Sequence, residues 1–164
     1  MMLERSLERD QMSDKLSNPV DARKKAMDYL ARREHGRAEL IAKLSRAGFD
    51  MDVADAAVAE LVVDKLQSDE RFVEAFIASR INQGKGPVKI RADLRERDIA
   101  AAVIDDGLRN AAADWTELAR QVRARKFGAG LPRDFRDKAR QMRFLQARGF
   151  DSDQIQAAVS ASAE

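Results

Sequence analysis

The 164-residue chain has no cysteine, which excludes disulfide bonds, thiolate metal ligands and cysteine nucleophiles and fits a reducing compartment. It has a single histidine, so no histidine pair is available to hold zinc. No run approaches the roughly 20 apolar residues that a membrane span needs, and residues 1–17 lack the apolar stretch of a secretion signal. We therefore expect a cytoplasmic protein that has no contact with a membrane.

Aromatic residues are also scarce, at 5%, whereas charged residues make up 35% and hydrophobic residues 45% of the chain. The hydrophobic content is enough to form a core. The high charge keeps much of the surface in water, which suits slender helices better than a thick globule. No strand-like alternation bounded by turn signals is present, so the sequence predicts an all-α protein.

One segment occurs three times at a spacing near 50 residues, which is the signature of a repeat. Its copies, whose apolar positions coincide, are Leu40–Phe49, Ile90–Ile99 and Gln141–Phe150. An apolar helical stripe precedes each copy and another follows it, so each unit has three helices. The prediction is nine helices in an elongated, curved array of three tandem three-helix repeats, spanning 21–66, 67–113 and 114–164 after a flexible N-terminal arm at 1–20.

Proline and glycine mark the expected ends of the middle helices. Pro87 and Pro132 stand where two of these helices should begin, because proline is tolerated in a first helical turn. Gly48 and Gly149 stand where they should end, since a helix C-terminus often needs a left-handed residue. Asp98 takes that position in the second repeat, where its side chain has a higher steric cost than glycine.

Other polar residues are expected to cap the remaining helices. Ser68 and Asp69 are candidate N-caps before the helix of the second repeat, and Asp50 and Asp151 are candidates before closing helices. The large apolar residues are assigned to the core of the repeats: Phe72, Phe76, Leu94, Trp115, Phe144 and Phe150.

Net charge oscillates three times along the chain, although the formal total is only +2. The middle segments are basic and the closing segments acidic. The basic segments are 21–49, with eight bases and four acids, 80–97, with six and two, and 115–148, with ten and three. The acidic segments are 50–70, with one base and seven acids, 98–114, with one and four, and 149–164, with none and three.

Groups able to perform catalysis are few. His35 falls in a connector without a nearby nucleophile, which favours a turn residue over a general base. The turn Gly84–Pro87 lacks both the spacing and the Ser or Thr of a phosphate-binding loop, so it predicts a tight turn with Lys85 at an exposed tip. The pair Asp105 and Asp106 is read as a solvated helix face rather than a magnesium site. We expect no catalytic, metal or cofactor-binding residue, and no enzyme.

Basic side chains form the candidate site. Gathering them is unfavourable unless an anionic partner or the acidic helices offset their charge, so partner binding is favoured over mere solubility. Because the charge is spread over every middle helix, sequence-specific DNA reading is disfavoured. The candidate partner- or DNA-binding residues are Arg80, Lys85, Lys89, Arg91, Arg95, Arg125, Lys126, Arg140 and Arg143.

Several motifs together resemble the bacterial RecX regulatory proteins. The central one is Asp69–Arg80 followed by Gly84–Ile90 and Leu94, with the two phenylalanines, the arginine and the Gly-x-Gly turn at the family spacing. The resemblance covers about residues 22–160, and its flanking motifs are Tyr29–His35, Asp114–Trp115, Arg125–Gly128 and Arg143–Phe150. Two helix-end residues depart from the family pattern: Gly36, where Ser or Thr is usual, and Asp98, where Gly is usual.

This resemblance implies a regulator that lodges in the groove of the RecA–DNA filament. It implies inhibition of filament growth, strand exchange, ATP hydrolysis and repressor cleavage in the SOS response. The partners would be the RecA filament and DNA of either strandedness, bound without sequence specificity. One alternative is a single-stranded DNA-binding protein that does not touch RecA, and another is an inert helical scaffold. We expect a monomer, because no large apolar patch remains once the three cores are filled.

Overall fold

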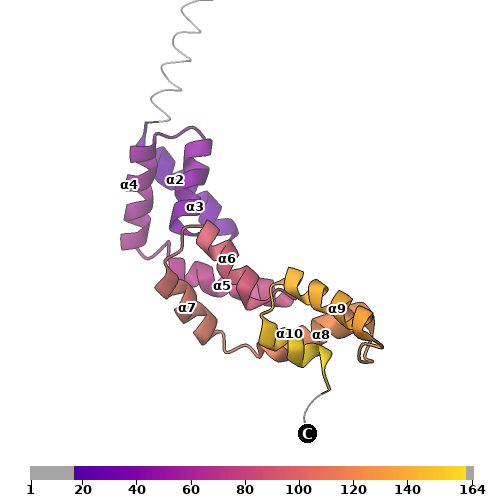
Figure 1. Ribbon diagram of the computed structural model, residues 1–164. Coiled ribbons are helices and arrows are strands. Elements are labelled where there is room, and N and C mark those ends of the chain that lie inside the picture. The colour runs from indigo at the N-terminus through magenta and orange to yellow at the C-terminus, as the bar shows by residue number, and fades with distance from the viewer. Residues whose placement is uncertain (1–16, 162–164) are drawn as a thin grey trace, which may run out of the picture. The chain divides into compact units, whose positions relative to one another are not determined.

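The computed structural model describes residues 17–161, which form nine helices and no strand (Figure 1). None of these helices is long and apolar enough to cross a membrane. The all-α prediction is confirmed. The helices are α2 (Pro19–Arg32), α3 (Arg37–Arg46), α4 (Met51–Val63), α5 (Asp69–Asn82), α6 (Pro87–Glu96), α7 (Ala101–Asn110), α8 (Trp115–Phe127), α9 (Phe135–Arg148) and α10 (Ser152–Val159).

The described residues divide into two compact units. The first comprises residues 17–72 with 97–99, and the second comprises 73–96 with 100–161. Helix α2 begins at Pro19, inside the segment expected to be an arm; the rest of that expected arm, residues 1–16, lies outside the described residues. The predicted curvature of the array remains a prediction.

The first unit is organised by the packing of α2, α3 and α4. Small residues of α2 and α4 let these helices approach, and leucines of α3 fill the space between them. The fully buried members of this core are Ala26, Leu40, Leu44, Ala54, Val58 and Leu61.

A carboxylate from α5 caps the start of α3. The N-cap of α3 is Gly36, which has no side chain to accept a hydrogen bond. A Cβ at this position would lie 3.3 Å from both Phe72 and Ile99, so a larger N-cap would be crowded. Instead, Asp69 Oδ1 accepts the Arg37 backbone N–H at 2.8 Å. The prediction that Asp69 caps its own helix is therefore wrong: Ser68 Oγ caps α5 by accepting the Arg71 N–H.

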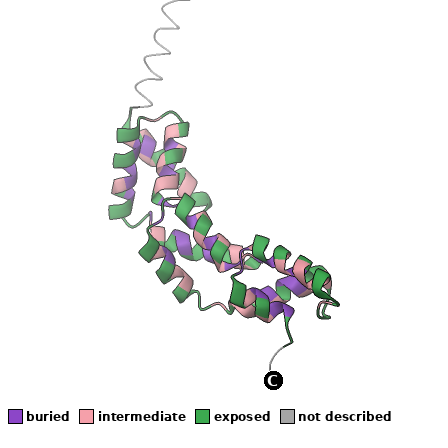
Figure 2. Ribbon diagram, in the orientation of Figure 1, coloured by how far each residue is buried: buried purple, intermediate pink, exposed green. Residues whose placement is uncertain are grey.

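The third repeat has a core of its own within the second unit. Helices α8, α9 and α10 enclose Ala119, Val122, Leu145, Phe150, Ile155, Ala158 and Val159. Figure 2 shows the buried residues on the helix sides that face one another. Phe144 is half-buried against this core, and Trp115 is also half-buried, so the assignment of these two to the interior was too strong. Phe72, Phe76, Leu94 and Phe150 are buried as predicted.

The three equivalent positions after the middle helices share a left-handed backbone. The φ angles are +101° at Gly48, +55° at Asp98 and +96° at Gly149. Gly149 is the C-cap of α9, where its N–H bonds back to Gln146 O at 3.0 Å. The prediction from the repeat alignment is confirmed at all three sites, and Asp98 is the one that carries a side chain.

Helix α6 begins at Pro87 as predicted, but Pro132 does not begin α9. That helix begins at Phe135, because the Asp134 carboxylate accepts the Asp137 N–H at 2.8 Å and acts as the N-cap. Pro132 lies in the connector from α8. Asp151 caps α10 through a reciprocal capping box with Gln154, whereas the Asp50 side chain at the N-cap of α4 accepts no hydrogen bond from that helix.

Within the second unit, two glycines bring the start of α6 against the end of α9. Gly86 N donates to Arg148 O at 2.8 Å, and Val88 N donates to Gly149 O at 2.9 Å. A Cβ on Gly86 would lie 2.3 Å from Gly149 O, and one on Gly149 would lie 2.3 Å from Lys89 Cβ. We call this contact the glycine junction. It depends on the absence of both side chains.

Replacing Asp98 with glycine should stabilise the protein. Glycine removes the steric cost of a Cβ at a left-handed residue, and this gain in stability is larger than the cost of the added conformational entropy of the unfolded chain. We expect a net gain of about 0.5–1 kcal/mol in the free energy of unfolding, measured by urea denaturation. An unchanged or lower midpoint would contradict the strain at this position.

Replacing Gly149 with alanine should destabilise the protein by about 2–4 kcal/mol, because it combines a positive φ with overlap against Lys89. Thermal unfolding followed by circular dichroism would measure the loss. Gly130→Ala is the matched control, since nothing lies within 4 Å of its added Cβ. Equal midpoints for the two variants would show that the glycine junction is not tight.

Candidate partner-binding surface

The basic residues of the second repeat lie at the end of α5, in the following turn and along α6. The Arg80 guanidinium lies 4.3 Å from the centre of the Phe76 ring and donates to Gln83 Oε1 at 3.2 Å. Lys85 follows Gly84, whose φ of +73° forms the predicted tight turn. The Lys85 side chain is half-buried rather than fully exposed at a tip. Arg95 is exposed on the last turn of α6.

Two cations of α6 have anionic neighbours. Lys89 Nζ lies 3.6 Å from Asp93 Oδ1 one turn along the same helix. Arg91 pairs with Asp105 of α7, and this hydrogen bond is the main cause that lowers the pKa of the Asp105 carboxyl. These groups are partly open to solvent, so each pair contributes little to stability.

The basic residues of the third repeat lie at the end of α8 and along α9. Arg125 and Lys126 occupy the last turn of α8, where cations favour the helix dipole. Lys126 Nζ also lies 5.9 Å from the Phe144 ring centre. Arg140 pairs with Asp137 at 2.8 Å, and this bond is the main cause of the lowered pKa of Asp137. Arg143 is exposed on the next turn of α9.

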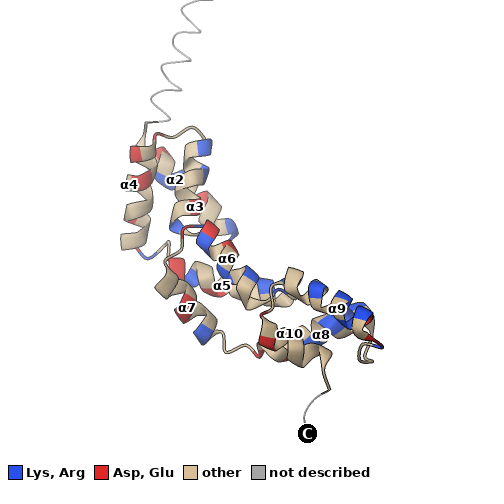
Figure 3. Cartoon of the chain, in the orientation of Figure 1, with Lys and Arg blue, Asp and Glu red and all other residues tan. Residues whose placement is uncertain are grey.

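The repeats differ in how far their acidic closing helix neutralises the basic middle helix. In the first, Arg37 of α3 pairs with Asp55 of α4 at 3.8 Å; in the second, Arg91 pairs with Asp105. Within residues 17–161, no ion pair joins α9 to α10. Figure 3 shows Lys and Arg gathered on α6, α8 and α9, whereas α4 carries only acidic charges. The positive charge of the third repeat is therefore the least compensated.

Lys85, Arg125 and Arg143 have no ion pair and no side-chain hydrogen bond within the part of the chain that the structure describes. Paired exposed cations must exchange one partner for another, whereas these three are available at once. Arg125 and Arg143 are exposed and Lys85 is half-buried, and Arg95 is likewise exposed without such a bond among the described residues.

Arg123 belongs to the same basic stretch of sequence but is buried, with 5% of its surface exposed. Its guanidinium donates to Gly130 O at 2.9 Å and to Gln141 Oε1 at 3.3 Å, which holds the connector between α8 and α9. Counting charges could not separate this arginine from its neighbours. The signal that could have identified it as buried is its position beside Ala119 and Val122 on the buried side of α8.

Sequence reasoning also missed two exposed apolar residues near the basic ones. Phe135 is 86% exposed at the start of α9, and Val88 is 54% exposed at the start of α6. Neither belongs to a helical stripe, so periodicity gave no reason to single them out. No group of three or more possible metal ligands occurs among the described residues.

Family models for the three three-helix domains of RecX match the chain in order. The first domain matches residues 22–61, the second 68–108 and the third 113–159. The chain belongs to the RecX family. It is thus a regulatory protein rather than an enzyme.

RecX proteins of known sequence match most of this chain. It is 47% identical over 139 residues to the regulatory protein RecX of Halorhodospira halophila, covering 85% of this chain and 86% of that protein. It is 45% identical over 140 residues to the RecX of Pseudomonas savastanoi pv. phaseolicola, covering 85% and 90%.

Solved RecX structures have the same fold. A crystal structure of regulatory protein RecX aligns with a TM-score of 0.73 at 21% identity, over 94% of this chain and 76% of that one. The RecX of Lactobacillus salivarius aligns with a TM-score of 0.71 at 20% identity, over 90% and 96%. At these identities the likeness establishes the fold alone.

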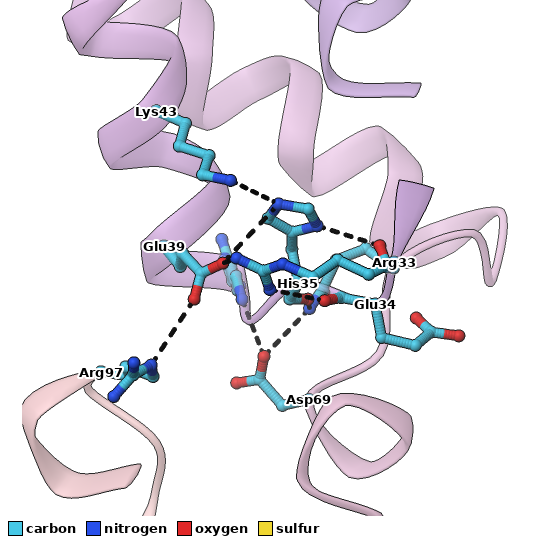
Figure 4. A network of polar contacts seen from close by, with 9 residues as sticks. Arg33, Glu34, His35, Glu39, Lys43, Asp69 and Arg97 are labelled. Atoms are coloured by element: carbon cyan, nitrogen blue, oxygen red, sulfur yellow. Dashed lines mark hydrogen bonds and ion pairs between the residues drawn. The ribbon is translucent and has the colours of Figure 1, made fainter. Parts of the chain in front are cut away.

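The only histidine of this RecX chain lies in the connector before α3, as predicted, but is almost fully buried (Figure 4). Lys43 Nζ lies 2.8 Å from His35 Nε2, and Arg33 O lies 3.0 Å from Nδ1. An ammonium group only donates, so Nε2 accepts from Lys43 and the ring proton is on Nδ1. Glu39 lies 3.6 Å from Nε2 and binds Arg33 at 2.5 Å. Arg97 Nε lies 3.7 Å from the other carboxylate oxygen of Glu39.

Burial is the main cause that lowers the pKa of His35, and the charges of Arg33 and Lys43 lower it further. The carbonyl of Arg33 and the carboxylate of Glu39 act in the opposite direction without outweighing these effects. The folded protein therefore keeps this imidazole neutral in a pH range where the unfolded chain binds a proton.

The free energy of unfolding should consequently fall as pH drops below about 6.5, the ordinary histidine pKa. The loss begins where the unfolded chain takes up the proton and ends once the folded protein does so as well. Urea denaturation between pH 7.5 and 5 would measure it. His35→Gln, which has no titrating group, should show a flatter dependence over the same range; parallel curves for the two proteins would contradict the lowered pKa.

Proposed function

We propose that this chain restrains the RecA recombinase by binding in the helical groove of its filament on DNA. Bound there, it limits filament growth, and with it strand exchange, ATP hydrolysis and repressor cleavage. Membership of the RecX family supports this proposal, because the chain carries all three domains of that family. The partner surface consists of the nine basic residues predicted from the sequence.

The observation that carries the proposal is the uncompensated charge of the third repeat and of the turn before α6. A cation already satisfied within its own protein contributes little new binding energy, since binding must first break its pair. Lys85, Arg125 and Arg143 have no such pair. DNA phosphates and acidic protein side chains both match them, and both occur in a protein filament assembled on DNA.

Repetition of the three-helix unit suits a partner that is itself a repeating polymer. Several weak contacts on one chain raise overall affinity, because the first contact gives the others a high effective concentration. The second and third repeats can then each bind weakly while the two together bind firmly. A single copy of this chain is sufficient for such binding.

The alternative is a protein that competes for single-stranded DNA without touching RecA. Such proteins usually stack bases on exposed aromatic rings. Here Phe72, Phe76 and Phe150 are buried, Trp115 and Phe144 are half-buried, and only Phe135 among the described aromatic residues is largely exposed. One exposed ring cannot stack successive bases of a strand. This distribution favours binding to the filament over base stacking along a free strand.

Reversing the charge of Lys85, Arg125 and Arg143 to glutamate should weaken inhibition of the RecA ATPase on single-stranded DNA. We expect the concentration needed for half-inhibition to rise about tenfold or more, because three attractive contacts become repulsive. Helical content should not change, since none of the three side chains makes an internal bond.

The matched control reverses Lys24, Arg32 and Arg46, which are exposed cations of the first repeat. It changes net charge equally and should inhibit almost as well as the natural chain. Equal loss in both variants would show that total charge matters rather than this surface. A natural chain that binds single-stranded DNA but leaves the RecA ATPase untouched would support the alternative.

A further inference from the structure

A groove on the third repeat combines exposed apolar side chains with unpaired cations. Helices α9 and α10 form its walls and the start of α6 closes one end, all within the second unit. We infer that this groove holds an acidic segment of RecA that carries at least one large apolar side chain. The inference rests on the proposed function and deepens it by naming the chemistry of the contact.

The apolar part of the groove gains from being covered. Phe135 is 86% exposed and Val88 is 54% exposed, and both line the groove. Met142, Phe150 and Ile155 line it further in. Covering exposed apolar surface is favourable, and aromatic side chains in a pocket are frequent anchors of interfaces. An apolar side chain of the partner fills this space.

The charged part of the groove selects an anionic partner. Lys138 and Arg143 line the groove, and neither side chain has an ion pair or hydrogen bond within residues 17–161. The one acid in the lining, Asp151, is committed to the capping box of α10, accepting the Gln154 N–H at 2.9 Å. Partner carboxylates beside the apolar anchor therefore find two free cations and no competing acid.

The mixed lining favours a polypeptide over a nucleic acid. A DNA strand could place a phosphate near Lys138 and stack a base on Phe135, but it has no aliphatic side chain to cover Val88, Met142 and Ile155 together. A peptide segment presents apolar and acidic side chains a few residues apart, which matches the groove.

The groove is also continuous with the proposed basic surface. Arg143 belongs to both, and Val88 is followed by Lys89, whose Cβ packs against Gly149 at the glycine junction. One contact area can thus bind phosphate or carboxylate on one side and hold an apolar anchor on the other.

The test measures binding of fluorescently labelled chain to RecA filaments, and separately to single-stranded DNA alone. Phe135→Ser should raise the Kd for the filament about five- to tenfold, and Lys138→Glu should raise it in the same direction. Neither should fold less stably, because both side chains are free of internal bonds. Val63→Ser is the matched control: this side chain is 79% exposed on α4 of the first unit and is not part of the groove lining, and its loss should leave the Kd unchanged.

A crosslinking experiment identifies the segment that occupies the groove. The chain has no cysteine, so Gln156→Cys in the groove lining can be labelled at one position with a photoreactive benzophenone. Irradiation on the filament should crosslink a RecA peptide rich in Asp and Glu with a neighbouring large apolar residue. The same label on Val63→Cys should not capture that peptide.

Three results would overturn the inference while leaving the proposed function intact: filament binding by Phe135→Ser equal to that of the natural chain, an equal loss of binding to single-stranded DNA alone, or a dimer of the natural chain that Phe135→Ser dissociates. A natural chain that neither binds the filament nor inhibits its ATPase would overturn both proposals together.

Discussion

The close backbone approach at the glycine junction determines where the candidate surface lies. Two hydrogen bonds, from Gly86 and Val88 to the last carbonyls of α9 and its cap, fix the start of α6 against the end of α9. Neither bond could form at this distance if Gly86 or Gly149 carried a Cβ. Because the helices are joined through main chain, the side chains that follow, Val88 and Lys89, have defined positions beside α9. The positions of the groove and its cations therefore depend on two residues that have no side chain.

Burial and pairing divide the arginines of this chain into three kinds that composition cannot distinguish. Arg123 is buried and satisfies backbone carbonyls and Gln141, so it holds a connector in place and is not available to a partner. Arg91 is partly exposed and paired with Asp105, a contact that contributes little to stability at a surface. Arg143 is exposed and unpaired. Availability to a partner therefore follows burial and pairing more than charge itself.

Much of the fold followed from the sequence because local signals agreed with the repeat. Apolar stripes, Pro87, and the left-handed positions Gly48, Asp98 and Gly149 each indicated the same helices. Prediction failed where a distant group decided the outcome. The carboxylate of Asp69 caps α3 rather than its own helix because Gly36 cannot, and no local pattern reveals a partner 32 residues away. Exposure of Phe135 was likewise hidden, since a residue outside every stripe gives no sign of its surroundings.

Exposed ion pairs are suited to a surface that must exchange partners. The pairs of Lys89 with Asp93 and Arg91 with Asp105 place an acid of the chain beside each cation, yet cost little to break. A phosphate or carboxylate of a partner can replace the internal acid at nearly constant charge. In the proposed complex, unpaired cations such as Arg143 supply the first attraction, and an apolar contact supplies binding that salt does not screen. Such a division lets one chain approach a charged polymer quickly through long-range attraction and then hold it through short-range packing.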